Sequence, residues 1–135
     1  MYTILVVDDD EDLLKALDFY LSQSNYHIIQ AKDGAEAVTK AYELQPDLVL
    51  LDIMMPSLDG LTACRGIKSM EKPKDIPVIM LTAKGDVETI KAAFKAGAND
   101  YVVKPFAIGQ ILQKMEEFLG TTGVRKRDSN VKEPY

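Results

Sequence analysis

The stretch ILVVDDDED, residues 4–12, decides the fold class. It begins with four consecutive apolar residues without polar alternation, which is typical of a strand buried on both faces of a parallel sheet. Similar runs recur at residues 48–51 and 78–81. Two further strands are expected at residues 27–31 and 101–103.

A helical pattern follows each predicted strand. Asp33 predicts the cap of a helix that ends before Pro46, and Asp86 predicts the cap of a helix that closes at Gly97. Further helices are expected over residues 61–70 and 108–119. In the first and fourth helices, apolar residues recur at helical spacing and are expected to pack inward. These residues are Leu13, Leu14, Leu17, Tyr20, Leu21, Val87, Ile90, Ala93 and Phe94.

Five strand and helix units in alternation, joined by short connections, favour one topology. Because parallel crossovers are right-handed, the units predict a doubly wound α/β fold. We therefore expect a five-stranded parallel sheet of the flavodoxin-like type with helices on both faces. The domain is expected to span residues 1–120, followed by a polar tail or truncated linker at 121–135.

Composition limits the class of protein. The 135 residues allow one domain, and hydrophobic and charged fractions of 47% and 27% are ordinary for a globular chain. No apolar stretch reaches the roughly 18 residues of a membrane span. Cys64 is the single cysteine, which is typical of a reducing compartment, so we expect a cytoplasmic protein with no membrane association.

The net charge of −5 is local, because residues 8–12 are all acidic. The one cationic cluster, residues 125–127, lies in the polar tail, so no direct nucleic acid binding by this domain is expected. Asp10, Glu11 and Asp12 are interpreted as solvent-facing acids in the first turn of the first helix.

Polar side chains follow the predicted strands at the edge where α/β sheets bind ligands. Asp8 and Asp9 follow the first run, Asp52 and Thr82 end the third and fourth, and Lys104 follows the fifth. Three carboxylates crowded together favour a cation, and hard oxygen ligands favour Mg²⁺. A metal and an ammonium beside one carboxylate suit a phosphoryl acceptor, and Asp52 is the candidate nucleophile.

Four segments together resemble the receiver domain of two-component response regulators. They are ILVVDDDED, LVLLDIMMPSLDG, VIMLTAK and DYVVKPF, and the resemblance covers roughly residues 3–119. It implies that Asp52 accepts a phosphoryl group from the phosphohistidine of a histidine kinase. It also implies that Asp9, Asp52 and the Met54 carbonyl bind Mg²⁺ directly, with Asp8 acting largely through water.

The same resemblance assigns roles on the phosphoryl side of the site. Thr82 and the Ala83 amide would contact the phosphoryl group, and Lys104 would pair with it. Tyr101 would be the aromatic residue whose rotamer follows Thr82, and a cis peptide bond would precede Pro105. The face made by the fourth helix, fifth strand and fifth helix would then change shape.

The implied partners are a sensor histidine kinase or phosphotransfer protein, and a downstream protein or attached effector domain. A phosphorylation-dependent dimer is a further option. The resemblance describes a self-phosphorylating phosphoacceptor rather than a turnover enzyme. Whether the chain is a stand-alone receiver or part of a longer regulator stays open.

Two residues near the acceptor predict a long-lived aspartyl phosphate. Met54 and Lys84 stand where some members of the family carry Asn, Gln or Glu side chains that orient the hydrolytic water. Methionine cannot orient a water by hydrogen bonding, and lysine offers donors without an acceptor.

Two other classes share features with this chain. A flavodoxin-like flavin carrier would need a phosphate-binding loop after the first strand, where residues 8–12 would repel the phosphate. A haloacid-dehalogenase-type phosphohydrolase also uses an aspartyl nucleophile and Mg²⁺, but it needs a second Asp where Met54 stands. His27 is interpreted as an edge-strand surface residue, Cys64 as a core residue, and Gly60 as a turn residue of the Asp52 loop.

Overall fold

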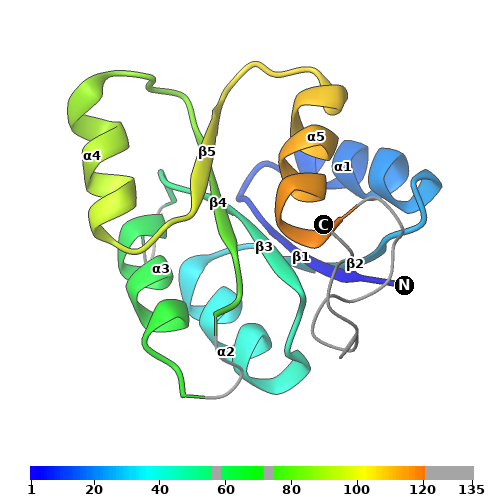
Figure 1. Ribbon diagram of the computed structural model, residues 1–135, viewed down its shortest axis with the longest axis horizontal. Coiled ribbons are helices and arrows are strands. Elements are labelled where there is room, and N and C mark those ends of the chain that lie inside the picture. The colour runs from blue at the N-terminus through cyan, green and yellow to red at the C-terminus, as the bar shows by residue number, and fades with distance from the viewer. Residues whose placement is uncertain (56–58, 72–74, 121–135) are drawn as a thin grey trace, which may run out of the picture.

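The computed structural model describes residues 1–55, 59–71 and 75–120. Within these ranges, strands and helices alternate along the chain, as predicted (Figure 1). The strands are β1 (Thr3–Val7), β2 (His27–Ala31), β3 (Leu48–Asp52), β4 (Val78–Thr82) and β5 (Asp100–Val103). The helices are α1 (Glu11–Gln23), α2 (Gly34–Leu44), α3 (Gly60–Lys68), α4 (Val87–Lys95) and α5 (Ile108–Leu119).

The strands form a single parallel sheet in the order β2-β1-β3-β4-β5. The order runs outward from β1 in both directions, so the chain switches direction between β1 and β3. Because all the strands are parallel, their carboxyl ends lie at one edge of the sheet. The side chains that follow β1 and β3 are therefore neighbours at the switch point, where α/β folds bind ligands.

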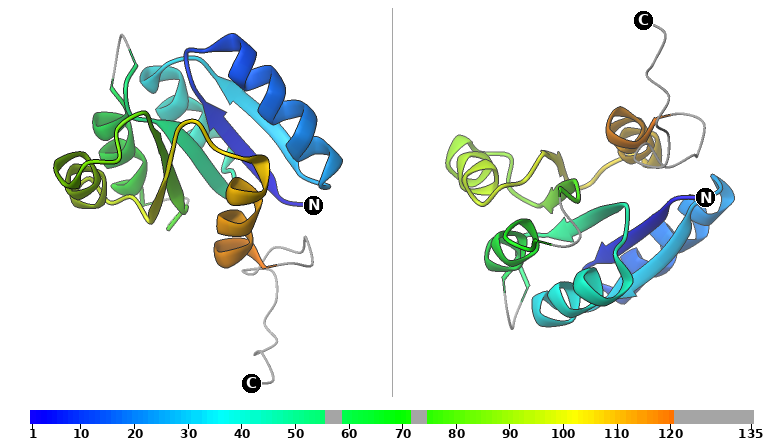
Figure 2. Two further views of the ribbon diagram at one scale, coloured as in Figure 1. Left: turned by 90° about the horizontal axis from the view of Figure 1, so that it is seen from above. Right: turned by 60° about the horizontal axis from the view of Figure 1, so that its bottom comes forward.

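The core consists of two apolar clusters, one on each face of the sheet. Successive strand residues point to opposite faces, so Val6 and Leu50 belong to one cluster while Leu5 and Val49 belong to the other. The first cluster is covered by α1 and α5, and the second by α2, α3 and α4 (Figures 1 and 2). Burial on both faces explains why β1, β3 and β4 are continuous apolar runs.

Aspartate side chains cap the first four helices. Asp33 and Asp86 accept backbone N–H groups at the starts of α2 and α4, as predicted, and Asp59 does so at the start of α3. Asp10 was expected in the first turn of α1, and this was wrong. Its backbone is extended and its side chain accepts the N–H groups of Asp12 and Leu13, so Asp10 is the cap that precedes the helix.

Three side chains expected to pack inward are exposed instead. Tyr20 on α1 is 48% exposed, and Val87 and Phe94 on α4 are 66% and 46% exposed. The helical spacing identified the correct stripe, but each of these residues lies at its margin. The buried residues are their neighbours in the sequence, Leu21 beside Tyr20 on α1 and Ala93 beside Phe94 on α4.

The expectations for His27 and Cys64 are met. His27 is exposed on the edge strand β2, and Cys64 is buried in α3. Among the helices of the described ranges, none combines the length and apolar character of a membrane span. The predicted tail at 121–135 lies outside the described residues.

Candidate functional site

Three carboxylates meet at the switch point of the sheet. Val7 at the end of β1 is in register with Leu51 on β3, so Asp8 and Asp52 are brought side by side. Asp8 and Asp52 are buried, whereas Asp9 is exposed. One oxygen from each of the three side chains lies within 4.8 Å of the others. The carboxylates predicted to gather at this edge therefore do so.

Lys104 enters the same site from the end of β5. Its Nζ lies 2.8 Å from an oxygen of Asp8 and 3.5 Å from Oδ1 of Asp52. The Lys104 backbone N–H donates to the Thr82 carbonyl over 2.7 Å, which ties this turn to β4. The Lys104–Pro105 peptide bond is cis, as the resemblance implied. The ammonium thus neutralises part of the charge of two buried carboxylates.

The electrostatics of the site centre on Asp52. Burial and, to a smaller extent, the negative charge of Asp8 together raise the pKa of this carboxyl from 3.8 to about 6. The Lys104 ammonium and the Met54 N–H, which donates to Asp52 Oδ1 over 3.3 Å, act in the opposite direction. In the absence of a cation, ionisation of Asp52 beside Asp8 is therefore less favourable than ionisation of a carboxyl in water.

The pKa of Lys104 reflects two opposing effects. Burial alone would lower it, but the hydrogen bond to Asp8 and the charges of Asp52 and Asp8 outweigh burial and raise it. Lys104 is consequently a fixed positive charge at neutral pH.

Thr82 is fully buried at the end of β4, and its hydroxyl is engaged locally. The hydroxyl donates to the Lys84 carbonyl and accepts from the Lys84 N–H, both over 2.9 Å. The sequence identified Thr82 but not this pairing, because it depends on backbone atoms of the loop that follows. Any new hydrogen bond donated by Thr82 must replace the one to Lys84.

The other predicted residues surround this centre. Met54, two residues after Asp52, has a side chain that is 60% exposed, and Ala83 and Lys84 are exposed after β4. Tyr101 is partly buried on β5 and packs against the core cluster beneath α2, α3 and α4. Its ring stands edge to face with Phe94 of α4, at a centroid distance of 6.0 Å. Sequence reasoning did not predict this contact, since Phe94 was assigned to the core.

Gly60 has a clear reason to be glycine. Its N–H donates to the Ile53 carbonyl over 2.9 Å, so the chain folds back directly onto the end of β3. A Cβ at residue 60 would lie 2.1 Å from the Asp52 carbonyl oxygen and 2.6 Å from the Ile53 Cα. Glycine is required here for space rather than for the turn conformation expected from the sequence. The close approach of the two backbone segments fixes the backbone of Asp52.

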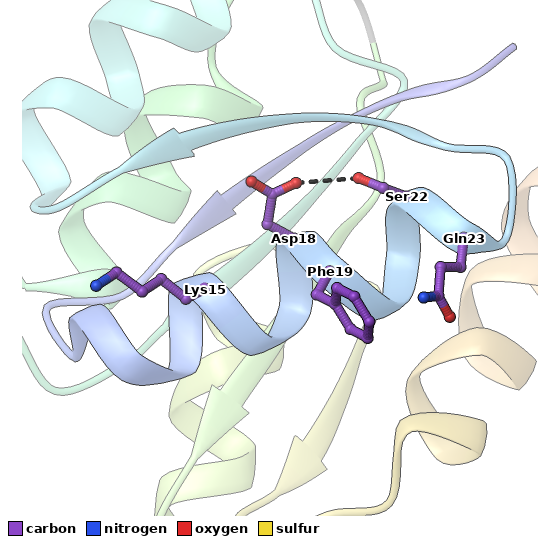
Figure 3. Close-up of a pocket in the computed structure, with 5 residues that line it drawn as sticks. All are labelled: Lys15, Asp18, Phe19, Ser22 and Gln23. Atoms are coloured by element: carbon purple, nitrogen blue, oxygen red, sulfur yellow. Dashed lines mark hydrogen bonds between the residues drawn. The ribbon is translucent and has the colours of Figure 1, made fainter.

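A separate hollow of about 470 Å³ runs along the outer surface of α1. Figure 3 shows its lining residues, Lys15, Asp18, Phe19, Ser22 and Gln23, all projecting from this helix. Ser22 donates to Asp18, one turn earlier on the helix, over 3.0 Å. None of the site carboxylates lines it, so this hollow is not part of the acidic site.

Comparison with known proteins matches residues 4–116 to the response regulator receiver domain family. The transcriptional regulatory protein ResD of Bacillus subtilis is 43% identical over 116 residues, covering 86% of this chain and 47% of ResD. The DNA-binding dual master transcriptional regulator RpaA of Synechocystis is 38% identical over 122 residues, covering 90% of this chain and 51% of RpaA. The chain thus spans about half the length of these curated relatives.

Solved structures agree with the sequence comparison. The receiver domain of the sensor histidine kinase PA1611 from Pseudomonas aeruginosa, with a magnesium ion in its active site cleft, has a TM-score of 0.82 and 30% identity, covering 88% of this chain and 98% of that one. A putative response regulator from Chloroflexus aurantiacus has a TM-score of 0.82 and 35% identity, covering 87% and 96%. These matches do not support the haloacid-dehalogenase alternative. The chain belongs to the family of receiver domains of two-component response regulators.

Proposed function

We propose that Asp52 is the phosphoryl acceptor of this receiver domain. The observation that carries the proposal is the environment of its carboxylate, which is 4% exposed, 3.5 Å from the Lys104 ammonium and beside Asp8 and Asp9. Its Oδ1 is held by the Met54 N–H and by Lys104. A carboxylate oxygen attacks the phosphorus of a phosphohistidine, the N–P bond breaks, and the imidazole keeps the electron pair.

Magnesium is the cofactor that the donor set favours. The three carboxylates supply hard oxygen ligands within 4.8 Å of one another, which fits a small divalent cation better than a soft metal. Asp9, Asp52 and the Met54 carbonyl would hold the ion directly, with Asp8 acting largely through water. Bound there, Mg²⁺ would compensate negative charge on the acceptor and on the phosphoryl oxygens. The magnesium-bound receiver domain of PA1611 supports this assignment.

The remaining residues stabilise the transferred group. Lys104, whose charge already faces Asp52, pairs with a phosphoryl oxygen as charge develops there. The Thr82 hydroxyl and the Ala83 amide donate to the other oxygens. To do so, Thr82 gives up its hydrogen bond to the Lys84 carbonyl, which disturbs the loop that leads into α4.

The output of the domain is a change in the surface formed by α4, β5 and α5, with Tyr101 turning as Thr82 moves. This surface would act on a downstream protein or an attached effector domain, or form a phosphorylation-dependent dimer. The relatives RpaA and ResD are transcriptional regulators about twice as long as this chain. In a regulator of that length, an attached effector domain would bind the DNA, and this domain would make no direct nucleic acid contact.

Several broader assignments belong to the same proposal. The domain spans residues 1–120, with residues 121–135 as a tail or linker. It receives its phosphoryl group from a sensor histidine kinase or phosphotransfer protein in the cytoplasm. It acts stoichiometrically as a phosphoacceptor, without turnover of a separate substrate.

The experiment that tests the proposal is metal-dependent phosphorylation by a small donor. Acetyl phosphate with Mg²⁺ should raise the intact mass of the protein by one phosphoryl group, and EDTA should abolish the increase. Lys104→Gln should slow the reaction strongly, whereas Lys15→Gln, in the hollow of α1 that none of the site carboxylates lines, should not. Equal labelling with EDTA and with Mg²⁺ would overturn the proposed role of the metal.

A further inference from the structure

Among the helices that the structure describes, α4 has the fewest buried residues. Among its nine residues, all of them described, Ala93 is the one buried side chain. In contrast, α1, α2 and α5 each bury three residues, and α3 buries four. Elements with few buried apolar contacts are the ones that move at low free-energy cost.

The other contacts of α4 include a pair of aromatic rings. Phe94, in the last turn of α4, stands edge to face with Tyr101 of β5, with a centroid distance of 6.0 Å and an interplanar angle of 87°. Tyr101 is partly buried against the core, whereas Phe94 is 46% exposed. Such pairs contribute about 0.5–1.5 kcal/mol beyond the area that they bury.

In the structure that contains this ring contact, the Thr82 hydroxyl is not available to a phosphoryl group. Both hydrogen bonds of this hydroxyl go to the backbone of Lys84, in the loop that leads into α4. Thr82 is therefore bonded to the loop before α4, and Phe94 lies in the last turn of the same helix. An arrangement in which Tyr101 turns away would lose the ring contact with Phe94.

We propose that Phe94 is a positioning residue that holds Tyr101, and through it α4, in the resting arrangement. The inference rests on the proposed function of Asp52 and Thr82. Phosphorylation must break the contact between Phe94 and Tyr101, so this contact reduces the population of the arrangement that accepts a phosphoryl group. Removing the ring of Phe94 raises that population without touching Asp52, Lys104 or bound metal.

The test is the initial rate of Mg²⁺-dependent labelling of the full chain by acetyl phosphate. Phe94→Ala should raise this rate about two- to ten-fold, the factor that corresponds to loss of one aromatic pair. Phe94→Leu, which keeps apolar bulk, should also raise it, and Phe94→Tyr should restore the wild-type rate. The matched control is Phe19→Ala, because Phe19 is 59% exposed and forms a similar edge-to-face pair with Tyr20 on α1.

A double-mutant cycle shows whether the effect passes through Tyr101. Phe94→Leu should leave the rate unchanged in a Tyr101→Ala background. The inference is overturned if folded Phe94→Leu labels at the wild-type rate or more slowly, or if Phe94→Leu accelerates labelling equally without Tyr101. If Phe94→Ala does not fold, Phe94→Leu decides. Failure of the proposed function is distinguishable, because wild-type protein would then not be labelled at Asp52 at all.

Discussion

Replacing Asp52 by asparagine should stabilise the metal-free protein at neutral pH. Burial and the neighbouring charge of Asp8 raise the pKa of Asp52 from 3.8 to about 6. The folded state therefore binds the proton more tightly than the unfolded state. Stability from this group is fully present below pH 3.8 and is lost as the pH rises through about 6. Asparagine cannot ionise, so the variant avoids that loss.

The size of the effect follows from the pKa. One pKa unit corresponds to about 1.4 kcal/mol, so the rise from 3.8 to about 6 corresponds to about 3 kcal/mol once the carboxyl is fully ionised. Part of this difference is already present at mildly acidic pH. Between about pH 4.5 and pH 7.5 the free energy of unfolding of Asp52→Asn should gain about 2 kcal/mol relative to wild type. An amide oxygen can still accept the Met54 N–H, so little else is lost.

The assay is urea unfolding in EDTA at several pH values. Asp33→Asn is the matched control, because asparagine still caps α2 and the residue lies outside the carboxylate cluster. This control separates the loss of a clustered carboxylate from the loss of an aspartate as such. A constant difference between Asp52→Asn and wild type, or a variant less stable than wild type at pH 7.5, would refute the reasoning.

Three further substitutions test other parts of the structure. Met54→Asn should shorten the lifetime of the phosphorylated protein about two- to ten-fold, the value of one hydrogen bond to the attacking water, as followed by intact mass. Gly60→Ala should lower the free energy of unfolding by more than about 2 kcal/mol through its clash with the end of β3, whereas Gly109→Ala on the open side of α5 should raise it by about 0.5 kcal/mol. Asn99→Ala should cost about 1–3 kcal/mol, because its Oδ1 accepts the Val78 N–H over 2.9 Å.

Each of these expectations can fail separately. A Met54→Asn protein that loses its phosphoryl group no faster than wild type contradicts the role given to the missing acceptor. Equal stabilities of Gly60→Ala and Gly109→Ala would mean that the loop after β3 can move aside. An Asn99→Ala variant as stable as wild type would mean that water replaces the amide at the start of β4.

Much of the fold could be predicted because burial on both faces leaves a strong trace in the sequence. The runs that became β1, β3 and β4 have no polar interruption, and the acids directly after them identify the edge where a site forms. Once the strands are parallel and β1 lies beside β3, Asp8 and Asp52 must be neighbours. Strand order and residue type together were sufficient for this part of the site.

The parts that could not be predicted depend on side-chain packing and loop backbone. Helical spacing placed Phe94 inward, but the spacing does not show how closely a helix approaches the sheet. Ala93 makes the buried contact, and Phe94 lies beside Tyr101 at the margin. Likewise, the hydrogen bonds between Thr82 and Lys84 are set by the path of a loop, which residue types alone do not determine.

The most direct test of the account is to identify the residue that carries the phosphoryl group. Wild-type protein would be treated with acetyl phosphate and Mg²⁺, digested at once, and its peptides sequenced by tandem mass spectrometry. The account predicts modification of Asp52 alone and an unmodified Asp52→Asn protein under the same conditions. A phosphoryl group found on Asp8, Asp9 or any other residue of the wild-type chain, or equal labelling of both proteins, would contradict it.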